Sequence, residues 1–391
     1  MKLAFLSLLA VLMAAPALAQ NTPARAPDLQ KRLDDYNRAR KAFLAESEAY
    51  WTAIAEKRRL RAQKRRTAQA VTREDYVLTQ PPVYTGPQRP IDPSVPQRDE
   101  TIPPKPWIPV IADFLKAARE HYGFVPDRPA SERAFKRAYV QAALTAGLTR
   151  EQILRVYAFE TGGNGTYDLQ AGLNPARPDS RAISPAMGYN QLLSTNSVSL
   201  LAMHGEDFVK TLTQKAASLP AAEKAALTRK IEILRRMIAQ SRTVPRQWAE
   251  HDKLANTPAG YGMHAAVLDR DIGPLLQTQK LLNSVQFARM RGVKRPLTGA
   301  ELELMNFTGD GNGIDMVLMP DSLREIVPTS NFFQQRGYER NPVARRTGTV
   351  AKLIADMDSR MDRFSQNAGA KEMAATFQAL NSEGPAPRRL P

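Results

Sequence analysis

The feature that most constrains this fold is a proline-rich stretch, TQPPVYTGPQRPIDPSVPQRDETIPPKPWIP, at residues 79–109. Proline lacks a backbone donor and clashes with the preceding helical turn, so no helix interior or central strand can pass through ten prolines in this span. An extended, semi-rigid linker is expected instead. The stretch therefore divides the chain into a region at 20–78 and a longer region at 110–382.

The longer region predicts an all-α fold. Apolar residues recur every three or four positions, as on one face of a helix, and convincing alternating patterns typical of strands are missing. The closing residues 383–391, EGPAPRRLP, are expected to be disordered. Helices are predicted at 110–121, 131–146, 149–160, 191–203, 220–241, 274–291, 299–307 and 347–365.

The region before the linker predicts a basic helical extension at 20–78. Residues 28–76 contain no Gly or Pro and are rich in Ala, Leu, Arg, Lys and Glu, which favours one long, polar helix. The run KRRLRAQKRR at 57–66 adds to a net charge of +16. Such charge favours an anionic surface as partner, although a charge run is often only a solvated helix face. Docking on a partner helix is a further alternative.

The first 19 residues predict a signal peptide. MKLAFLSLLAVLMAAPALAQ has one Lys, a short apolar run and small residues at Ala17 and Ala19, which fits cleavage after Ala19. The apolar run is short for a spanning helix. The expected location is the periplasm, where a cell-wall polymer is a better polyanionic partner than nucleic acid. The chain has no cysteine, which excludes disulfides and thiolate chemistry.

The stretch FETGGNG at 159–165 contains the strongest candidate for a functional residue. Thr149 and Gln152 fit a capping box that starts a helix, and Glu160 falls on the same helical face as the apolar Tyr157. Two consecutive glycines then end the helix. Apolar neighbours and the negative end of the helix dipole both disfavour the ionised carboxylate, so we expect a raised pKa for Glu160.

Glu160 is followed by a polar loop that holds Ser184-Pro185-Ala186 and the turn GYNQ, Gly188 to Gln191, and later by ELMNFTGDGNG at 303–313. This order resembles the lytic transglycosylases of the soluble SLT type in the lysozyme-like superfamily. The resemblance covers about 130–320. It departs from the family pattern where Thr161 replaces a Ser, Tyr189-Asn190 replace Leu-Met, and Met305 replaces a Tyr.

The resemblance implies a lysozyme-like helical domain at 110–382, and the long interval between motifs suggests a helical insertion around 206–270. It implies cleavage of the MurNAc-GlcNAc bond of peptidoglycan, with Glu160 as general acid and then base, giving 1,6-anhydro-MurNAc products. No cofactor and no metal are expected. The residues expected to bind substrate are Thr161, Gly188, Tyr189, Gln191 and Asn306.

Two alternatives stay open. A hydrolytic muramidase would use Asp168 or Asp179 as a second carboxylate. A non-catalytic protein could keep the groove as a peptidoglycan-binding scaffold. Other chemistries have less support, because the histidines are scattered, DGNGID at 310–315 lacks the spacing of a calcium loop, and no serine lies in a nucleophile elbow.

Overall fold

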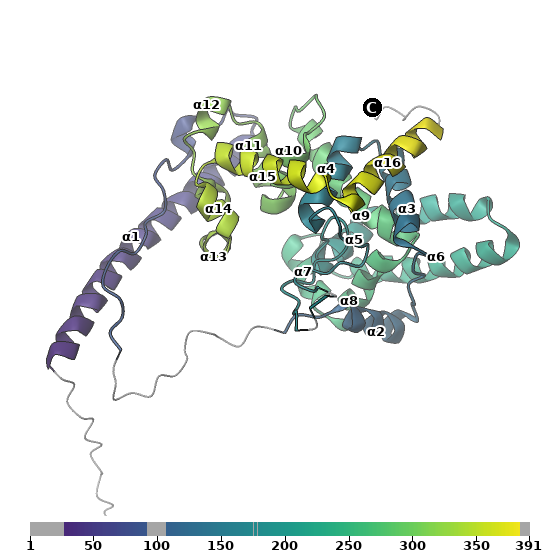
Figure 1. Cartoon of the computed structure of the whole chain (residues 1–391), viewed down its shortest axis with the longest axis horizontal. Coiled ribbons are helices and arrows are strands. Elements are labelled where there is room, and N and C mark those ends of the chain that lie inside the picture. The colour runs from purple at the N-terminus through teal and green to yellow at the C-terminus, as the bar shows by residue number, and fades with distance from the viewer. Residues whose placement is uncertain (1–26, 92–106, 175, 178, 384–391) are drawn as a thin grey trace, which may run out of the picture. The chain divides into compact units, whose positions relative to one another are not determined.

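The structure is a computed structural model that describes residues 27–91, 107–174, 176–177 and 179–383. The predicted signal peptide, most of the central part of the predicted linker and nearly all of the predicted tail lie outside these residues. The described ranges form helices and loops with isolated β-bridges and no strand, which confirms the all-α prediction (Figure 1). Within these ranges, no helix is long and apolar enough to cross a membrane.

The helices agree with the predicted segments to within a few residues at most ends, and α5 runs well beyond its predicted end. The sequence reading missed most of the short helices and the last long one. The longer helices are α1 (Pro27–Arg66), α2 (Ile111–Tyr122), α3 (Glu132–Thr145), α4 (Arg150–Thr161), α5 (Ser194–Ala217), α6 (Ala221–Ser241), α9 (Ile272–Met290), α10 (Gly299–Thr308), α15 (Val350–Ser365) and α16 (Ala368–Glu383). The shorter ones are α7 (Trp248–Ala255), α8 (Pro258–His264), α11 (Asp310–Val317), α12 (Asp321–Arg324), α13 (Gln335–Glu339) and α14 (Pro342–Thr347), with 3-10 turns η1 (Arg73–Asp75), η2 (Ala265–Leu268) and η3 (Thr329–Phe332).

The chain divides into two compact units, and the division differs from the predicted domains. The first unit comprises Met1–Tyr50 and Pro82–Thr101. Within it, the ring of Tyr84 packs on Phe43, with centroids 5.4 Å apart. Part of the proline-rich segment therefore lies against the first part of α1.

The second unit contains Trp51–Pro81 and Ile102–Pro391, so the end of α1 belongs to the body of the protein. Arg61 is fully buried. Its guanidinium lies 3.3 Å from Asp315 and donates to the backbone carbonyls of Asp75 at 2.9 Å and Asn331 at 2.7 Å. The basic run is thus not a separate extension, because its buried charge is neutralised by the body.

The predicted helical insertion is an integral part of the second unit. Helices α5, α6 and α8 share one hydrophobic core with α2 and with Met187 and Leu192, which flank the GYNQ turn. A second core joins α3, α4, α9, α10 and α16. Residues 206–270 are therefore largely helical, and they share a core with the residues that flank the GYNQ turn, whereas α4 and α10 belong to the second core.

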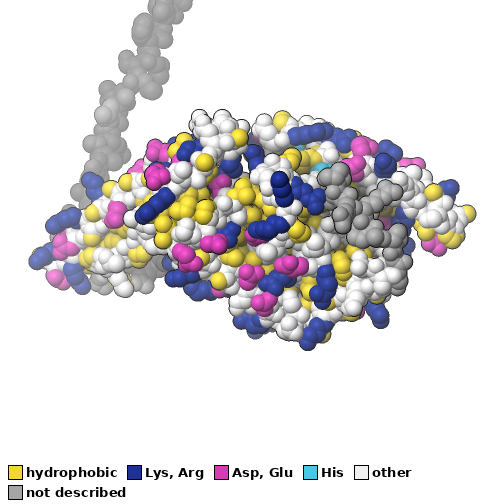
Figure 2. Space-filling view, turned by 90° about the horizontal axis from the view of Figure 1, so that it is seen from above, with side chains coloured by type: hydrophobic (Ala, Val, Ile, Leu, Met, Phe, Trp, Pro, Cys, Tyr) yellow, Lys and Arg dark blue, Asp and Glu magenta, His cyan; other side chains and the backbone are white. Residues whose placement is uncertain are grey.

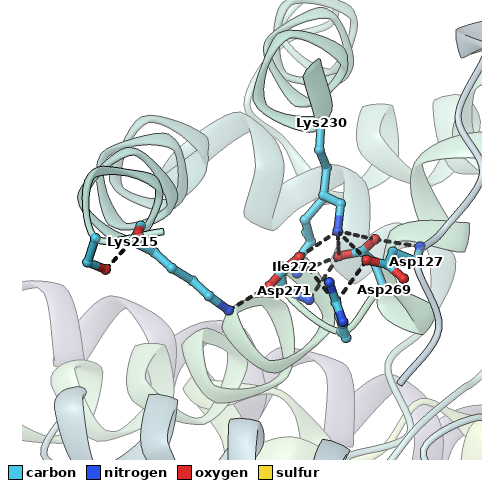
Figure 3. Close-up of polar contacts among 8 residues, drawn as sticks. Asp127, Lys215, Lys230, Asp269, Asp271 and Ile272 are labelled. Atoms are coloured by element: carbon cyan, nitrogen blue, oxygen red, sulfur yellow. Dashed lines mark hydrogen bonds and ion pairs between the residues drawn. The ribbon is translucent and has the colours of Figure 1, made fainter. Parts of the chain in front are cut away.

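An ion-pair cluster fixes α6 to the start of α9 (Figure 3). Lys230 of α6 lies 3.0 Å from Asp269 and 2.5 Å from Asp271, and Lys215 of α5 lies 2.7 Å from Asp271. Asp269 also accepts a hydrogen bond from the backbone nitrogen of Ile272 at 3.1 Å, which caps the first turn of α9. The position of α9 matters because this helix reaches the candidate site.

Candidate active site around Glu160

Helix α4 brings Glu160 to the site and ends just beyond it. The predicted capping box is present, with Thr149 and Gln152 exchanging hydrogen bonds of 3.0 and 3.2 Å. The helix stops at Gly162, whose φ of +63° is the left-handed conformation that glycine adopts readily. Glu160 is partly exposed in the last turn. The residue therefore keeps some exposed surface while its helix is anchored in the core.

The end of α4 is fixed by the junction between α15 and α16. The carbonyl of Gly162 accepts a hydrogen bond from the side chain of Asn367 at 2.7 Å, and that of Gly163 accepts one from the backbone of Ala370 at 2.8 Å. A Cβ atom at Gly163 would lie 2.1 Å from the carbonyl oxygen of Phe364. Glycine is thus required at position 163 for two reasons: the backbone of Phe364 leaves no room for a side chain, and the positive φ angle is unfavourable for other residues.

Two residues of α10 meet Glu160 from the other side. Glu303 and Asn306 are three positions apart and so share a helix face. The amide nitrogen of Asn306 lies 2.8 Å from Oε1 of Glu160 and 3.4 Å from Oε1 of Glu303. The side chains of Glu160 and Glu303 also hydrogen-bond each other. Figure 1 shows α4 and α10 close together in the second unit.

Glu303 is the residue that the sequence reading missed. It is only 1 % exposed, and its Oε2 atom has no hydrogen-bond partner among the described residues. A buried carboxyl without full hydrogen bonding is costly and calls for an explanation. One feature of the sequence could have pointed to Glu303. Its carboxylate lies between Leu302 and Leu304, three residues before Asn306, in a part of the helix that is otherwise largely apolar.

The pair of carboxyl groups retains protons that isolated glutamates would lose. Burial raises the pKa of Glu160 to about 7, opposed by hydrogen bonds from Glu303 and Asn306 and by the positive charge of Lys280 on α9. Burial and the neighbouring charge of Glu160 raise the pKa of Glu303 well above its ordinary value. The two groups titrate as a pair, which holds at least one proton through the neutral range.

The GYNQ turn is a tight hairpin tip pinned to α9. Met187 and Leu192 exchange two backbone hydrogen bonds across it. Gly188 has a φ of +82°, and a Cβ atom there would lie 2.8 Å from the side chain of Gln277. Gln277 also accepts a hydrogen bond from the backbone of Asn190 at 3.1 Å. The turn is therefore held by α9, the helix that brings Lys280 to the carboxyl pair.

Tyr189 corrects one prediction, because it is a core residue and lines no groove. Its side chain is 0 % exposed. Its ring packs edge-on against Phe135, Tyr139 and Tyr157, and its hydroxyl hydrogen-bonds to Glu132. A side chain with no free surface cannot contact a ligand in this conformation.

Three further predicted binding residues make internal contacts. Gly188 is buried at the turn. Gln191, with a φ of +42°, donates to the carbonyl of Gly188 at 2.8 Å, and Thr161 donates to the carbonyl of Tyr157 at 2.6 Å. Thr161 and Gln191 are partly exposed, so a ligand contact by either stays a prediction. Of the predicted binding residues, Asn306 is the one with a recorded contact to Glu160 among the described residues.

The carboxylate in contact with Glu160 is Glu303, which differs from the two candidates considered for a hydrolase. Asp168 accepts a hydrogen bond from Thr166 at 2.7 Å and lies 3.6 Å from Arg128. Asp179 is exposed in the loop. Neither has a recorded contact with Glu160 in the described part of the chain.

His264 is a second residue without a role in the sequence reading. It is 0 % exposed and lies 2.8 Å from the hydroxyl of Ser197 and 2.9 Å from the carbonyl oxygen of Pro185. Burial lowers its pKa to about 4, so the ring is neutral. It ties α8 and α5 to the segment just before the GYNQ turn.

No metal site is indicated by the described residues, which contain no cluster of three His, Asp or Glu side chains suited to a metal ion. The DGNGID segment forms most of α11 instead of a calcium loop. Its Asp310 accepts a hydrogen bond from Ser284 at 2.7 Å, and its Asp315 pairs with Arg61.

Comparisons with protein-family models, curated proteins and solved structures found no match to the chain.

Proposed function

We propose that the protein is an exported lytic transglycosylase that acts on peptidoglycan in the periplasm, with Glu160 as its general acid and base. The observation that carries this proposal is a partly exposed carboxyl with a pKa of about 7, held by Asn306 and a buried second carboxyl. A proton donor works best when its pKa lies near the operating pH. The resemblance of the surrounding motifs to the transglycosylase family supplies the substrate class.

In the first step, Glu160 gives its proton to the oxygen that links MurNAc to GlcNAc, and the bond from that oxygen to the anomeric carbon of MurNAc breaks. In the second, the 6-hydroxyl of the same MurNAc attacks the anomeric carbon and the Glu160 carboxylate takes the hydroxyl proton. The products are a free 4-hydroxyl on GlcNAc and a 1,6-anhydro-MurNAc end. Asn306 orients the carboxyl throughout.

The contact between Glu160 and Glu303 favours this route over hydrolysis by two opposed carboxylates. Glycoside hydrolases with two catalytic carboxyls hold them about 5 Å or more apart, on opposite sides of the sugar bond. Here the two side chains are hydrogen-bonded to each other. Two carboxyl groups in direct contact are not arranged as opposed catalytic carboxylates, which supports an attacking group that comes from the substrate, with Glu303 keeping the proton on the pair.

The net positive charge supports an anionic polymer as partner. Lys and Arg side chains are scattered over the face shown in Figure 2, with Asp and Glu between them, so this face offers no single basic patch. Within the basic run at 57–66, Arg61, Lys64 and Arg65 pair with Asp75 or Asp315. Arg59 and Arg66 remain exposed for an anionic surface or another partner.

The test is digestion of purified peptidoglycan, followed by mass analysis of the released muropeptides. We expect ends that are lighter by one water than hydrolysed ends, the mark of 1,6-anhydro-MurNAc. If only reducing ends are found, the protein is a hydrolytic muramidase. If it binds the cell wall but releases no product, it is a non-catalytic scaffold.

A further inference from the structure

A cavity of about 450 Å³ opens at the end of α10, and neither Glu160 nor Glu303 lines it. Phe307 and Thr308, at the end of α10, form one wall. Phe307 lies four positions after Glu303, so these two residues share a face of α10, and it follows Asn306 directly. The cavity thus lies at the end of α10, the helix that carries both residues in contact with Glu160.

The lining also includes Arg58 of α1, a cation without a partner among the described residues. Its side chain is partly buried, and it has no hydrogen bond or ion pair with any described residue. Burial lowers the pKa of Arg58, and no carboxylate acts to raise it. Arg61 and Arg65 on the same helix both pair with Asp315. Arg58 is therefore a partly desolvated guanidinium whose counter-charge the described chain does not supply.

The rest of the lining indicates what kind of molecule carries that counter-charge. The rings of Phe307 and Phe333 lie edge to face, with centroids 5.7 Å apart, and Asn312 adds a side-chain amide. No Asp or Glu lines the cavity. Aromatic surface suits an apolar group or the face of a sugar, and a guanidinium binds a carboxylate through paired hydrogen bonds.

We propose that this cavity binds a carboxylate group on the glycan that Glu160 cleaves, with Arg58 as its ion-pair partner. The proposal rests on the proposed function for the identity of the ligand. The carboxylates available on peptidoglycan belong to the peptide attached to the lactyl group of MurNAc. Arg58 then selects glycan that carries a peptide over bare polysaccharide.

The test compares two probes that differ in one charge: an N-acetylmuramoyl dipeptide with one free carboxylate, and the same compound with that carboxylate amidated. Binding to the full-length protein is measured by calorimetry for the wild type, Arg58→Gln and Arg59→Gln. Arg59 is the neighbouring exposed arginine and does not line the cavity, so its variant is a matched control for net charge. Sodium acetate, added as a competitor, distinguishes a general carboxylate site from one that needs the sugar.

We expect the free acid to bind the wild type about tenfold or more tightly than the amide, because a hydrogen bond to a charged group is lost with the amide. Arg58→Gln should abolish this preference, and Arg59→Gln should keep it. Equal binding of both probes to the wild type, or an unchanged preference in Arg58→Gln, overturns the proposal. Displacement by acetate at equal concentration overturns the assignment to glycan and leaves a simple carboxylate site.

The measurement needs no turnover, so its outcome is separate from that of the digestion. A protein that releases no anhydro-muropeptides can still show the Arg58-dependent preference, which would refute the proposed reaction alone. A protein that cleaves peptidoglycan without that preference would refute the cavity proposal alone. Thermal unfolding of Arg58→Gln should match the wild type closely, because Arg58 has no recorded partner to lose.

Discussion

The amide nitrogen of Asn306 lies 2.8 Å from Oε1 of Glu160, which joins α10 to α4 across 146 positions of the chain. The same amide is 3.4 Å from Oε1 of Glu303. One neutral donor therefore serves two carboxyl groups, and a pair in that situation is stable only while it keeps a proton. The predictions on activity and on alkaline stability follow from this arrangement.

Glu160→Gln should reduce cleavage of peptidoglycan by about 10²–10⁴-fold, because it removes the proposed proton donor and keeps the shape of the side chain. Unfolding in denaturant should show no loss of stability. Asp168→Asn and Asp179→Asn are the controls, and both should retain cleavage within a few-fold. Retention of full activity by Glu160→Gln would refute the assignment, and a severe loss in either control would revive the two-carboxylate hydrolase.

Glu303→Gln should change how stability depends on pH. The pKa values of Glu160 and Glu303 are raised in the folded state, so the fold binds protons that the unfolded chain releases. Wild-type stability from this pair is fully present below the ordinary glutamate pKa and is lost as the pH rises through 7 and beyond. The variant cannot ionise at 303, so it should gain stability relative to wild type as the pH rises above the ordinary pKa of a glutamate.

Glu301→Gln is the control of opposite sign. Burial tends to raise the pKa of Glu301, but hydrogen bonds from Arg295 and the backbone of Thr298 lower it overall. Its stabilising effect is therefore present above the ordinary glutamate pKa and lost as the pH falls. Urea unfolding across the pH range checks both variants. A constant difference between Glu303→Gln and wild type would show that the buried pair does not hold the proton.

Arg61→Ala should lower the free energy of unfolding by about 3 kcal/mol, because it removes one of the two arginines that neutralise the buried Asp315 and leaves two backbone carbonyls without their donor. Arg59→Ala, on the same helix and exposed, should stay within about 0.5 kcal/mol of wild type. Denaturant titration measures both. Equal effects would mean that the end of α1 is not part of the body.

Truncation tests the same unit boundary. A protein that begins at Trp51 keeps Arg61 and should retain a cooperative unfolding transition. One that begins at Ile102 loses Arg61 and Arg65 together, leaves the buried Asp315 unpaired and should be markedly less stable. If the shorter protein were as stable as the longer one, the domain boundary predicted from the prolines would be the correct one.

Acid should weaken the fold through His264. Its pKa is lowered to about 4 in the folded state from an ordinary 6.5. Between these two pH values the unfolded chain binds a proton on this histidine and the folded chain does not. This contribution to stability is present above 6.5 and is lost as the pH falls through about 4. His264→Gln should lower the free energy of unfolding at neutral pH. That free energy should then fall less steeply than in the wild type as the pH is lowered from 6.5 to 4. The exposed His121→Gln should retain the wild-type profile.

Local rules determined much of this protein from its sequence. The capping box at Thr149, the glycine stop at 162 and the place of Glu160 on the apolar face all depend on neighbours within one or two helical turns. The all-α class follows from the same short-range periodicity. The raised pKa of Glu160 could be expected in direction for the same reason, since its helix face predicted burial.

What only the tertiary structure decided involves partners that are far apart in the chain. Glu303 meets Glu160, Arg61 meets Asp315, and Gly163 lies against the carbonyl of Phe364. The sequence pattern marks a helix face as apolar or charged, but it carries no information on which distant face packs against it. The boundary predicted from the prolines differs from the compact units for this reason: prolines forbid a helix locally, whereas the compact units depend on which side chains are buried together.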